Sequence, residues 1–142
     1  RDLHLSLRRQ RQMCIRDRDN HINIVLIGSD NAKDSAAIIF DKFSKQNVIN
    51  CVAKFTFKQT AEIINQAKML FCCDGGLMHP ANALKTPIIG LFARHEPHML
   101  LTESICAFSL YNKNNVNNIS VKKIIEKYNE AANFVHNHPQ FE

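Results

Sequence analysis

The chain has 142 residues, of which 45% are hydrophobic and 22% charged, a composition that suits one soluble globular domain with a single core. No apolar run approaches the roughly 18 residues that a membrane-spanning helix needs. No apolar stretch near the start resembles a secretory signal. We therefore expect an intracellular, cytoplasmic protein.

The net charge of +5 is concentrated in the first 18 residues, which hold six arginines and two aspartates. The remaining 124 residues hold 12 basic and 11 acidic side chains. A nucleic-acid-binding domain usually carries its basic residues on the fold itself, so we expect no nucleic-acid partner.

Residues 1–18 show no helical or strand periodicity and resemble translated sequencing-adapter sequence. We interpret them as a non-native tail or a disordered basic arm, the alternative being an arm that binds RNA or a membrane surface. If the tail is non-native, the natural protein extends further at its N-terminus and this chain is a fragment.

The five cysteines are odd in number and include no Cys-x-x-Cys pair, which favours reduced thiols over a disulfide framework. Most of them fall in predicted strands. Cys72 and Cys73 are neighbours, so on a strand they should point to opposite faces.

Strand and helix patterns alternate from Asn20 to about Ala132, and we expect this range to form one domain. Short apolar runs predict strands at residues 22–27, 48–52, 69–73, 88–92 and 105–110. Amphipathic stretches predict helices at 32–46, 57–66, 77–84 and 121–132. The alternation predicts an α/β, Rossmann-like fold with helices on both faces of a parallel sheet. Residues 133–142 are expected to form a frayed tail, and residues 93–104 and 112–118 to be loops.

Helical spacing also predicts which side chains face the core, and small polar residues predict the helix starts. Ser29 or Asp30 is expected to cap the first helix, and Ser120 the last. The expected core faces are Ala36, Ile39, Phe40 and Phe43 in the first helix, Phe57, Ala61 and Ile64 in the second, and Val121, Ile124, Ile125 and Tyr128 in the last.

Ligands of parallel α/β sheets bind outside the carboxyl ends of the strands. Three predicted strand ends carry candidate residues, namely Gly28-Ser29-Asp30, Asp74-Gly75-Gly76 and Ala93-Arg94-His95. The first lacks the Gly-x-Gly-x-x-Gly fingerprint, so we expect no nicotinamide cofactor. A loose metal site from His95, His98, His136 and His138 is disfavoured because the spacing fits no zinc motif, so we expect no metal.

The strand end at Asp74 has the chemistry of an anion site. Free N–H groups and the helix dipole at a helix start favour a phosphate, while glycines allow close approach and tolerate positive φ. The Asp74 carboxylate would repel phosphate and is better suited to sugar hydroxyls or to holding the turn. His79, one turn into the helix, could face the same anion. A tight turn capped by Asp74 explains the local pattern equally well.

A longer string extends this pattern: residues 69–97 read MLFCCDGGLMHPANALKTPIIGLFARHEP and resemble glycosyltransferase family 9, the heptosyltransferase group. The family's pattern is an apolar strand, Asp-[Ser/Thr/Gly]-Gly, two residues, His, a small-residue helix, Thr-Pro, a strand, and Leu-Phe leading to Pro. The matching residues are Asp74, Gly75, Gly76, His79, Ala81, Ala83, Thr86, Pro87, Leu91, Phe92 and Pro97. The resemblance extends more weakly over residues 22–128.

The resemblance implies the C-terminal, donor-binding half of a type B glycosyltransferase fold. It implies that the backbone of Gly75 and Gly76 cradles the diphosphate of a nucleotide-sugar donor such as ADP-heptose, that His79 supports it, and that Asp74 contacts the transferred sugar. Asp34 is a looser candidate for the ribose hydroxyls. Arg94 could pair with a phosphate, or be an ordinary surface arginine.

The implied reaction is an inverting transfer, without a metal, onto a lipopolysaccharide core or other glycolipid acceptor. It implies work at the inner face of the bacterial inner membrane, with peripheral membrane association. The family's catalytic base lies in an N-terminal domain that this chain lacks, so we expect donor binding without turnover. The alternative is a non-catalytic Rossmann-like module that binds a nucleotide or a protein partner.

Three departures from the family pattern bear on the site. Position 75 is Gly where Ser or Thr is common. Residues 93–96 read Ala-Arg-His-Glu in place of a Gly-Pro-Thr-Asp-like loop. A phosphate-contacting lysine near the start of the C-terminal half would fall in the atypical tail.

Overall fold

The computed structural model describes residues 23–43, 47–101 and 106–141. The chain consists of two compact units, divided between Thr60 and Ala61, and each is described by itself. The predicted tail at residues 1–18, residue 22 of the first strand and residues 44–46 of the first helix lie outside the described residues. The domain expected over residues 20–132 stays a prediction.

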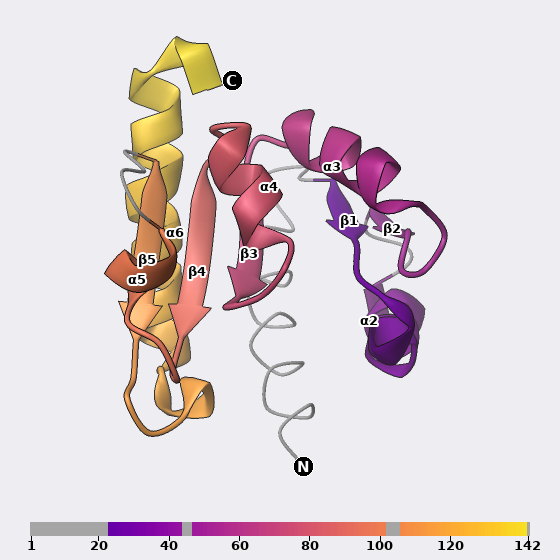
Figure 1. Ribbon diagram of the computed structural model, residues 1–142, viewed down its shortest axis with the longest axis horizontal. Coiled ribbons are helices and arrows are strands. Elements are labelled where there is room, and N and C mark those ends of the chain that lie inside the picture. The colour runs from indigo at the N-terminus through magenta and orange to yellow at the C-terminus, as the bar shows by residue number, and fades with distance from the viewer. Residues whose placement is uncertain (1–22, 44–46, 102–105, 142) are drawn as a thin grey trace. The chain divides into compact units, whose positions relative to one another are not determined.

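The first unit is built on two short parallel strands, β1 (Ile24–Leu26) and β2 (Val48–Asn50) (Figure 1). A 3-10 turn, η2 (Asp30–Ala32), leads from β1 into α2 (Lys33–Phe43). Parallel strands need a crossover connection, and α2 lies within it. A small core joins the helix to the strands through Ile39, Phe43, Val48, Ile24 and Leu26.

The predicted core face of α2 is confirmed at Ala36, Ile39 and Phe43, which are buried. It is wrong at Phe40, which is 36% exposed. The three buried residues are spaced i, i+3 and i+7 and define a narrow stripe. Phe40 lies beside this stripe, about 100° around the helix from Ile39, so it reaches only the margin of the contact.

Helix α3 (Phe57–Asn65) begins with a reciprocal cap. The backbone N–H of Thr56 donates to Oε1 of Gln59 at 2.9 Å, and the N–H of Gln59 donates to Oγ1 of Thr56 at 3.4 Å. This capping box satisfies two N–H groups at the helix start. Of the predicted core face, Ile64 is buried but Phe57 is 64% exposed, because packing covers only the last turn of the stripe.

The second unit holds a parallel sheet of β3 (Leu70–Cys73), β4 (Ile88–Phe92) and β5 (Ala107–Tyr111), in that order. Strand β4 is central and all five of its residues are buried. Strand β5 lies at one edge of this three-stranded sheet. Both α4 (Met78–Ala83) and α5 (Pro97–Leu100) lie in crossovers between these strands, and α5 occupies part of a segment predicted to be loop.

The two faces of this sheet are covered by different helices. The ring of Phe108 on β5 packs edge-to-face on Phe134 of α6 (Val121–Asn137), with ring centroids 5.5 Å apart. Figure 1 shows α4 on the opposite side of the sheet from α6. The predicted α/β arrangement of a parallel sheet with helices on both faces is therefore confirmed.

Helix α6 follows a short 3-10 helix, η3 (Val116–Asn118), and starts as predicted. The Oγ of Ser120 accepts a hydrogen bond from the N–H of Lys123 at 3.4 Å. The predicted end near Ala132 is wrong, because the apolar stripe continues through the buried Val135 and the helix reaches Asn137. His138 then stacks on Phe134 with ring centroids 4.1 Å apart, so these residues are packed rather than frayed.

Thr86 is the one buried polar residue in the described core and ties α3 to β4. Its Oγ1 donates to the carbonyl of Ile64 at 3.1 Å, across 22 residues of sequence. Its backbone N–H donates to the carbonyl of Ala81 at 3.0 Å. The Thr-Pro step that ends α4 therefore also fixes the start of the central strand.

The Thr86→Val substitution should lower the free energy of unfolding by about 1–3 kcal/mol, because it leaves the buried Ile64 carbonyl without its donor. Urea denaturation followed by circular dichroism measures the change. Thr60→Val is the matched control, since it removes a hydroxyl that donates to the Thr56 carbonyl at an exposed site. Equal loss of stability in the two variants would contradict the assignment.

Candidate functional site

The carboxyl ends of β3, β4 and β5 meet at one edge of the sheet, because the three strands are parallel and in register. Pairing continues one residue past β3 and β5. The N–H of Asp74 donates to the carbonyl of Leu91 at 3.0 Å, and the N–H of Asn112 donates to the carbonyl of Phe92, also at 3.0 Å. The residues that leave these strands therefore start from a rigid frame.

The turn after β3 presents backbone N–H groups. It is closed by the N–H of Met78, which donates to the carbonyl of Gly75 at 3.1 Å. Met78 and Ala81 are fully buried and anchor α4 on the sheet. Within residues 47–101, the N–H groups of Gly75, Gly76 and Leu77 have no hydrogen-bond partner. Three consecutive donors are thus available to a ligand at this edge.

The backbone conformation of the turn does not require glycine at position 75 or 76. Neither Gly75 nor Gly76 has a positive φ, so the turn does not use the tolerance of glycine for that conformation. A Cβ atom at Gly76 would meet no atom within 4 Å, and one at Gly75 would meet only the carbonyl oxygen of Cys73 at 3.8 Å. Their lack of a side chain leaves open the space that a Cβ atom would occupy beside the turn.

The alternative of a turn capped by Asp74 is not what the structure shows. The N-cap position of α4 is Leu77, and no side chain caps the helix. Asp74 is half-buried beside the turn, and His79 is exposed in the first turn of α4. Both predicted residues therefore lie at the same strand end as the two glycines.

The Cys72 thiol, two residues before Asp74, has a raised pKa to which the Asp74 charge contributes. Burial raises the pKa of Cys72 to about 12, and the negative charges of Cys73 and Asp74 add to the shift. Cys72 therefore stays protonated at neutral pH and is a poor nucleophile. Cys72 is half-buried and Cys73 exposed, in keeping with their expected positions on opposite faces.

Arg94 is exposed and lies in the loop two residues after β4, the strand that pairs with β3. Adjacent parallel strands bring its loop to the same edge as the Asp74 turn. Glu96 in this loop lies 3.3 Å from Nδ1 of His98. Among the described residues, no group of three or more His, Cys, Asp or Glu side chains could hold a metal ion.

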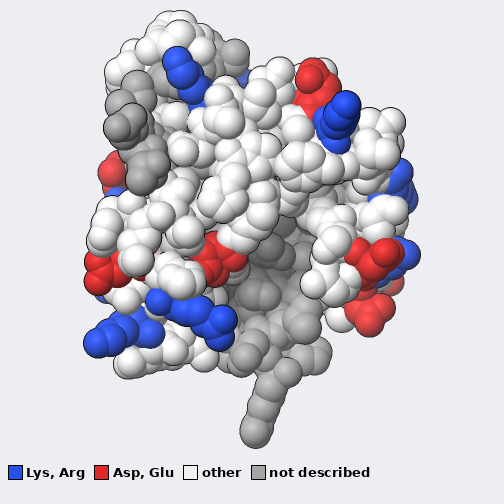
Figure 2. All heavy atoms as spheres, viewed as in Figure 1, with Lys and Arg blue, Asp and Glu red and all other residues white. Residues whose placement is uncertain are grey.

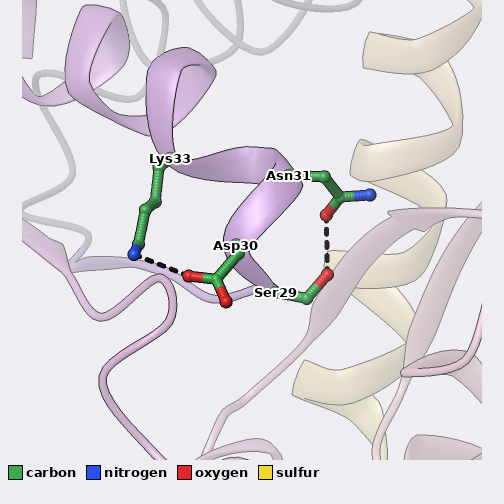
Figure 3. Close-up of polar contacts among 4 residues, drawn as sticks. All are labelled: Ser29, Asp30, Asn31 and Lys33. Carbon is green, nitrogen blue, oxygen red and sulfur yellow. Dashed lines mark hydrogen bonds and ion pairs between the residues drawn. The ribbon is translucent and has the colours of Figure 1, made fainter.

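The strand end at Ser29 is occupied by contacts of its own (Figure 3). The Oγ of Ser29 donates to Oδ1 of Asn31 at 2.6 Å, and Asp30 pairs with Lys33 at 2.6 Å. Ser29 occupies the N-cap position of η2, but neither side chain makes the predicted cap hydrogen bond, because Ser29 pairs with Asn31 and Asp30 with Lys33. Asp34 is exposed in the first turn of α2, in the first unit, and its role toward a ligand stays a prediction.

In each unit, Figure 2 shows side chains of both charges on the visible face. No described helix combines the length and hydropathy of a membrane-spanning segment.

The comparisons with known proteins agree with this geometry. The family model for glycosyltransferase family 9 (heptosyltransferase) matches residues 12–129. The chain belongs to this family. No curated protein matches it.

Two solved structures share the fold. E. coli ADP-heptose LPS heptosyltransferase II superposes with a TM-score of 0.71 at 21% identity, over 92% of this chain and 40% of that one. A glycosyl transferase family 9 protein from Veillonella parvula gives 0.79 at 16% identity, over 88% of this chain and 40% of that one. The chain thus corresponds to less than half the length of each, and both confirm the expected type B glycosyltransferase fold.

Sequence reasoning missed the third strand end of this family 9 chain. Tyr111, the last residue of β5, and Asn112 after it lie at the same edge as the Asp74 turn. The available signal was the end of the predicted fifth strand, which was placed one residue early at Leu110. Only the order β3-β4-β5 shows that this end lies at the site.

The contrast between neighbouring thiols is testable. At pH 8, iodoacetamide should alkylate Cys73 much faster than Cys72, because Cys73 is exposed whereas the raised pKa of Cys72 leaves almost no thiolate. Tandem mass spectrometry of the peptide that contains both residues measures the two rates. In a Cys73→Ser variant, Cys72 should remain unmodified until guanidinium is added. Rapid labelling of native Cys72 in that variant would refute the prediction.

Proposed function

We propose that this chain is the donor-binding part of a family 9 glycosyltransferase. It binds a nucleotide-sugar such as ADP-heptose, whose sugar is transferred to a lipopolysaccharide core or related glycolipid acceptor. The observation that carries the proposal is the row of backbone N–H groups from Gly75 to Leu77, which lack partners within residues 47–101, beside two glycines that leave the space of a side chain open.

Backbone N–H groups, more than the helix dipole, would hold the donor diphosphate. Helix α4 has only six residues, so its dipole is small. Three adjacent N–H groups can donate hydrogen bonds to phosphate oxygens without any side chain, and bonds to a charged acceptor are stronger than neutral ones. His79 and Arg94 would add donors from the first turn of α4 and from the neighbouring loop.

The proposed reaction is an inverting displacement at the anomeric carbon of the donor. The acceptor hydroxyl oxygen forms a bond to this carbon as the bond to the diphosphate oxygen breaks. A base takes the hydroxyl proton. The N–H groups of the turn stabilise the charge that the diphosphate gains, which is a task for fixed dipoles and needs no metal.

We assign acceptor binding and the catalytic base to a part of the full-length family 9 transferase that lies outside these 142 residues. The chain aligns with 40% of each solved relative. The Asp74 carboxylate is proposed to bind sugar hydroxyls rather than to act as the base. We therefore propose that the 142-residue chain binds donor without turnover and that a full-length protein would work at the cytoplasmic face of the inner membrane.

Gly76→Ala separates binding from folding. The added methyl meets no protein atom within 4 Å, so the free energy of unfolding should change by no more than about 1 kcal/mol. The methyl would occupy the space of the phosphate, and loss of one charge-assisted hydrogen bond should weaken donor binding by roughly tenfold or more. Titration calorimetry with ADP-heptose and with UDP-glucose measures the affinity.

Ala83→Ser is the matched control, since it adds one atom at an exposed site at the other end of α4. It should leave both stability and donor affinity unchanged. Unchanged donor affinity in Gly76→Ala would exclude the turn as the phosphate site. Failure of the unmodified chain to bind either nucleotide-sugar would count against the proposed function itself.

A further inference from the structure

Tyr111 is an aromatic side chain at the open edge of the sheet that the preceding proposal does not use. It ends β5 and is 40% exposed. No other strand of the described sheet ends in an exposed aromatic residue: β3 ends in Cys73, and Phe92 at the end of β4 is fully buried. An exposed ring at the carboxyl ends of parallel strands is well placed to contact a ligand.

The register places Tyr111 in the row of the sheet that runs through Phe92 to the backbone of Asp74, the first residue of the turn after β3. Cys73 is aligned with Leu91, and Phe92 with Tyr111. Asp74 follows Cys73, so Asp74, Phe92 and Tyr111 form the last row across the three strands. Phe92 and Tyr111 are paired strand residues of this row, so their side chains project from the same face. The backbones of Asp74 and Tyr111 are two strand spacings apart, roughly 10 Å.

The residue between them is turned away from the edge. A Cβ atom at Gly90 would lie 2.6 Å from Cε2 of Phe92, which means that the Phe92 ring folds back over Gly90. The ring thus fills the space above the middle of β4 and does not extend beyond the strand end. Asp74 and Tyr111 consequently flank the end of β4, and the Phe92 ring does not project between them.

We propose that Tyr111 binds the sugar of the donor from the side opposite Asp74 and so helps to select it. This inference rests on the proposed function, in which the diphosphate lies on the Gly75–Leu77 amides. A sugar ring has apolar C–H faces and a rim of hydroxyls. Tyrosine offers both an apolar ring surface and a hydroxyl that can donate or accept a hydrogen bond. The Asp74 carboxylate accepts hydrogen bonds from hydroxyls on the other side.

The test compares each nucleotide-sugar with its free diphosphate. ADP-heptose, ADP, UDP-glucose and UDP are titrated into the 142-residue chain by calorimetry, and the ratio of affinities gives the contribution of the sugar. Tyr111→Phe should lower this ratio by about threefold to tenfold, the effect of one lost hydrogen bond. Tyr111→Ala should lower it by about tenfold or more, while affinity for the free diphosphate stays constant.

Leu84→Ala is the matched control. Leu84 is 41% exposed, a fraction similar to the 40% of Tyr111. It lies at the C-terminal end of α4, from which the chain leads back to the start of β4. The control should leave both affinities unchanged, and thermal unfolding of every variant checks that the fold is intact.

The outcomes distinguish the two proposals. If the unmodified chain binds the free diphosphate and gains affinity from the sugar, but Tyr111→Ala keeps the full gain, the Tyr111 inference fails and the proposed function stands. Equal loss of diphosphate and nucleotide-sugar affinity in Tyr111→Ala would also overturn it, because the ring would then serve the nucleotide or the fold. If no nucleotide binds the unmodified chain, both proposals fall.

Discussion

The site depends on the parallel pairing of β4 with a strand on either side. All five residues of β4 are buried, so its position admits little variation, and its neighbours are held to it in register. The hydrogen bonds from Asp74 to Leu91 and from Asn112 to Phe92 carry that order one residue beyond the strands. The three strand ends are therefore fixed relative to one another before any ligand arrives, which is the preorganisation that a binding site needs.

The backbone N–H groups that this sheet edge leaves without a hydrogen-bond partner are as informative as the groups that are paired. Folded proteins pair nearly all buried backbone N–H groups. The N–H groups of Gly75 to Leu77 escape this requirement because both glycines are exposed to solvent and Leu77 is only half-buried. A ligand that binds there replaces water on donors that already have their final geometry. An anion gains most from this exchange, since its oxygens can accept from several donors at once.

Much of this arrangement could be predicted from local patterns. The central strand was predicted to its exact residues, Ile88–Phe92, because a short apolar run between Pro87 and a polar segment has few other interpretations. The Asp74 turn was predicted from its composition and its place after a strand. The predictions of burial were wrong where tertiary packing decides which side chains are covered. Phe40 and Phe57 have the spacing of a core face, but their side chains are exposed.

Other features lay beyond any local pattern. The hydrogen bond from Thr86 to Ile64 joins residues 22 positions apart, and sequence reasoning used Thr86 only as part of the family's Thr-Pro step. Helix α6 continued past its predicted end because Val135 is buried within the segment that was predicted to fray, residues 133–142. Tyr111 and Asp74 are 37 positions apart in the chain, and only the order of the strands places them in one row.

The glycines give the sharpest argument for function. Gly90 is required by the fold, because the Phe92 ring occupies the place of a side chain. Gly76 is not: its backbone conformation suits other residues and a methyl group would meet nothing. Glycine at such a position lowers stability by raising the conformational entropy of the unfolded chain, and no packing contact compensates for this loss. The same residue type thus serves the core in β4 and, where the fold makes no demand for it, leaves the turn open to a ligand.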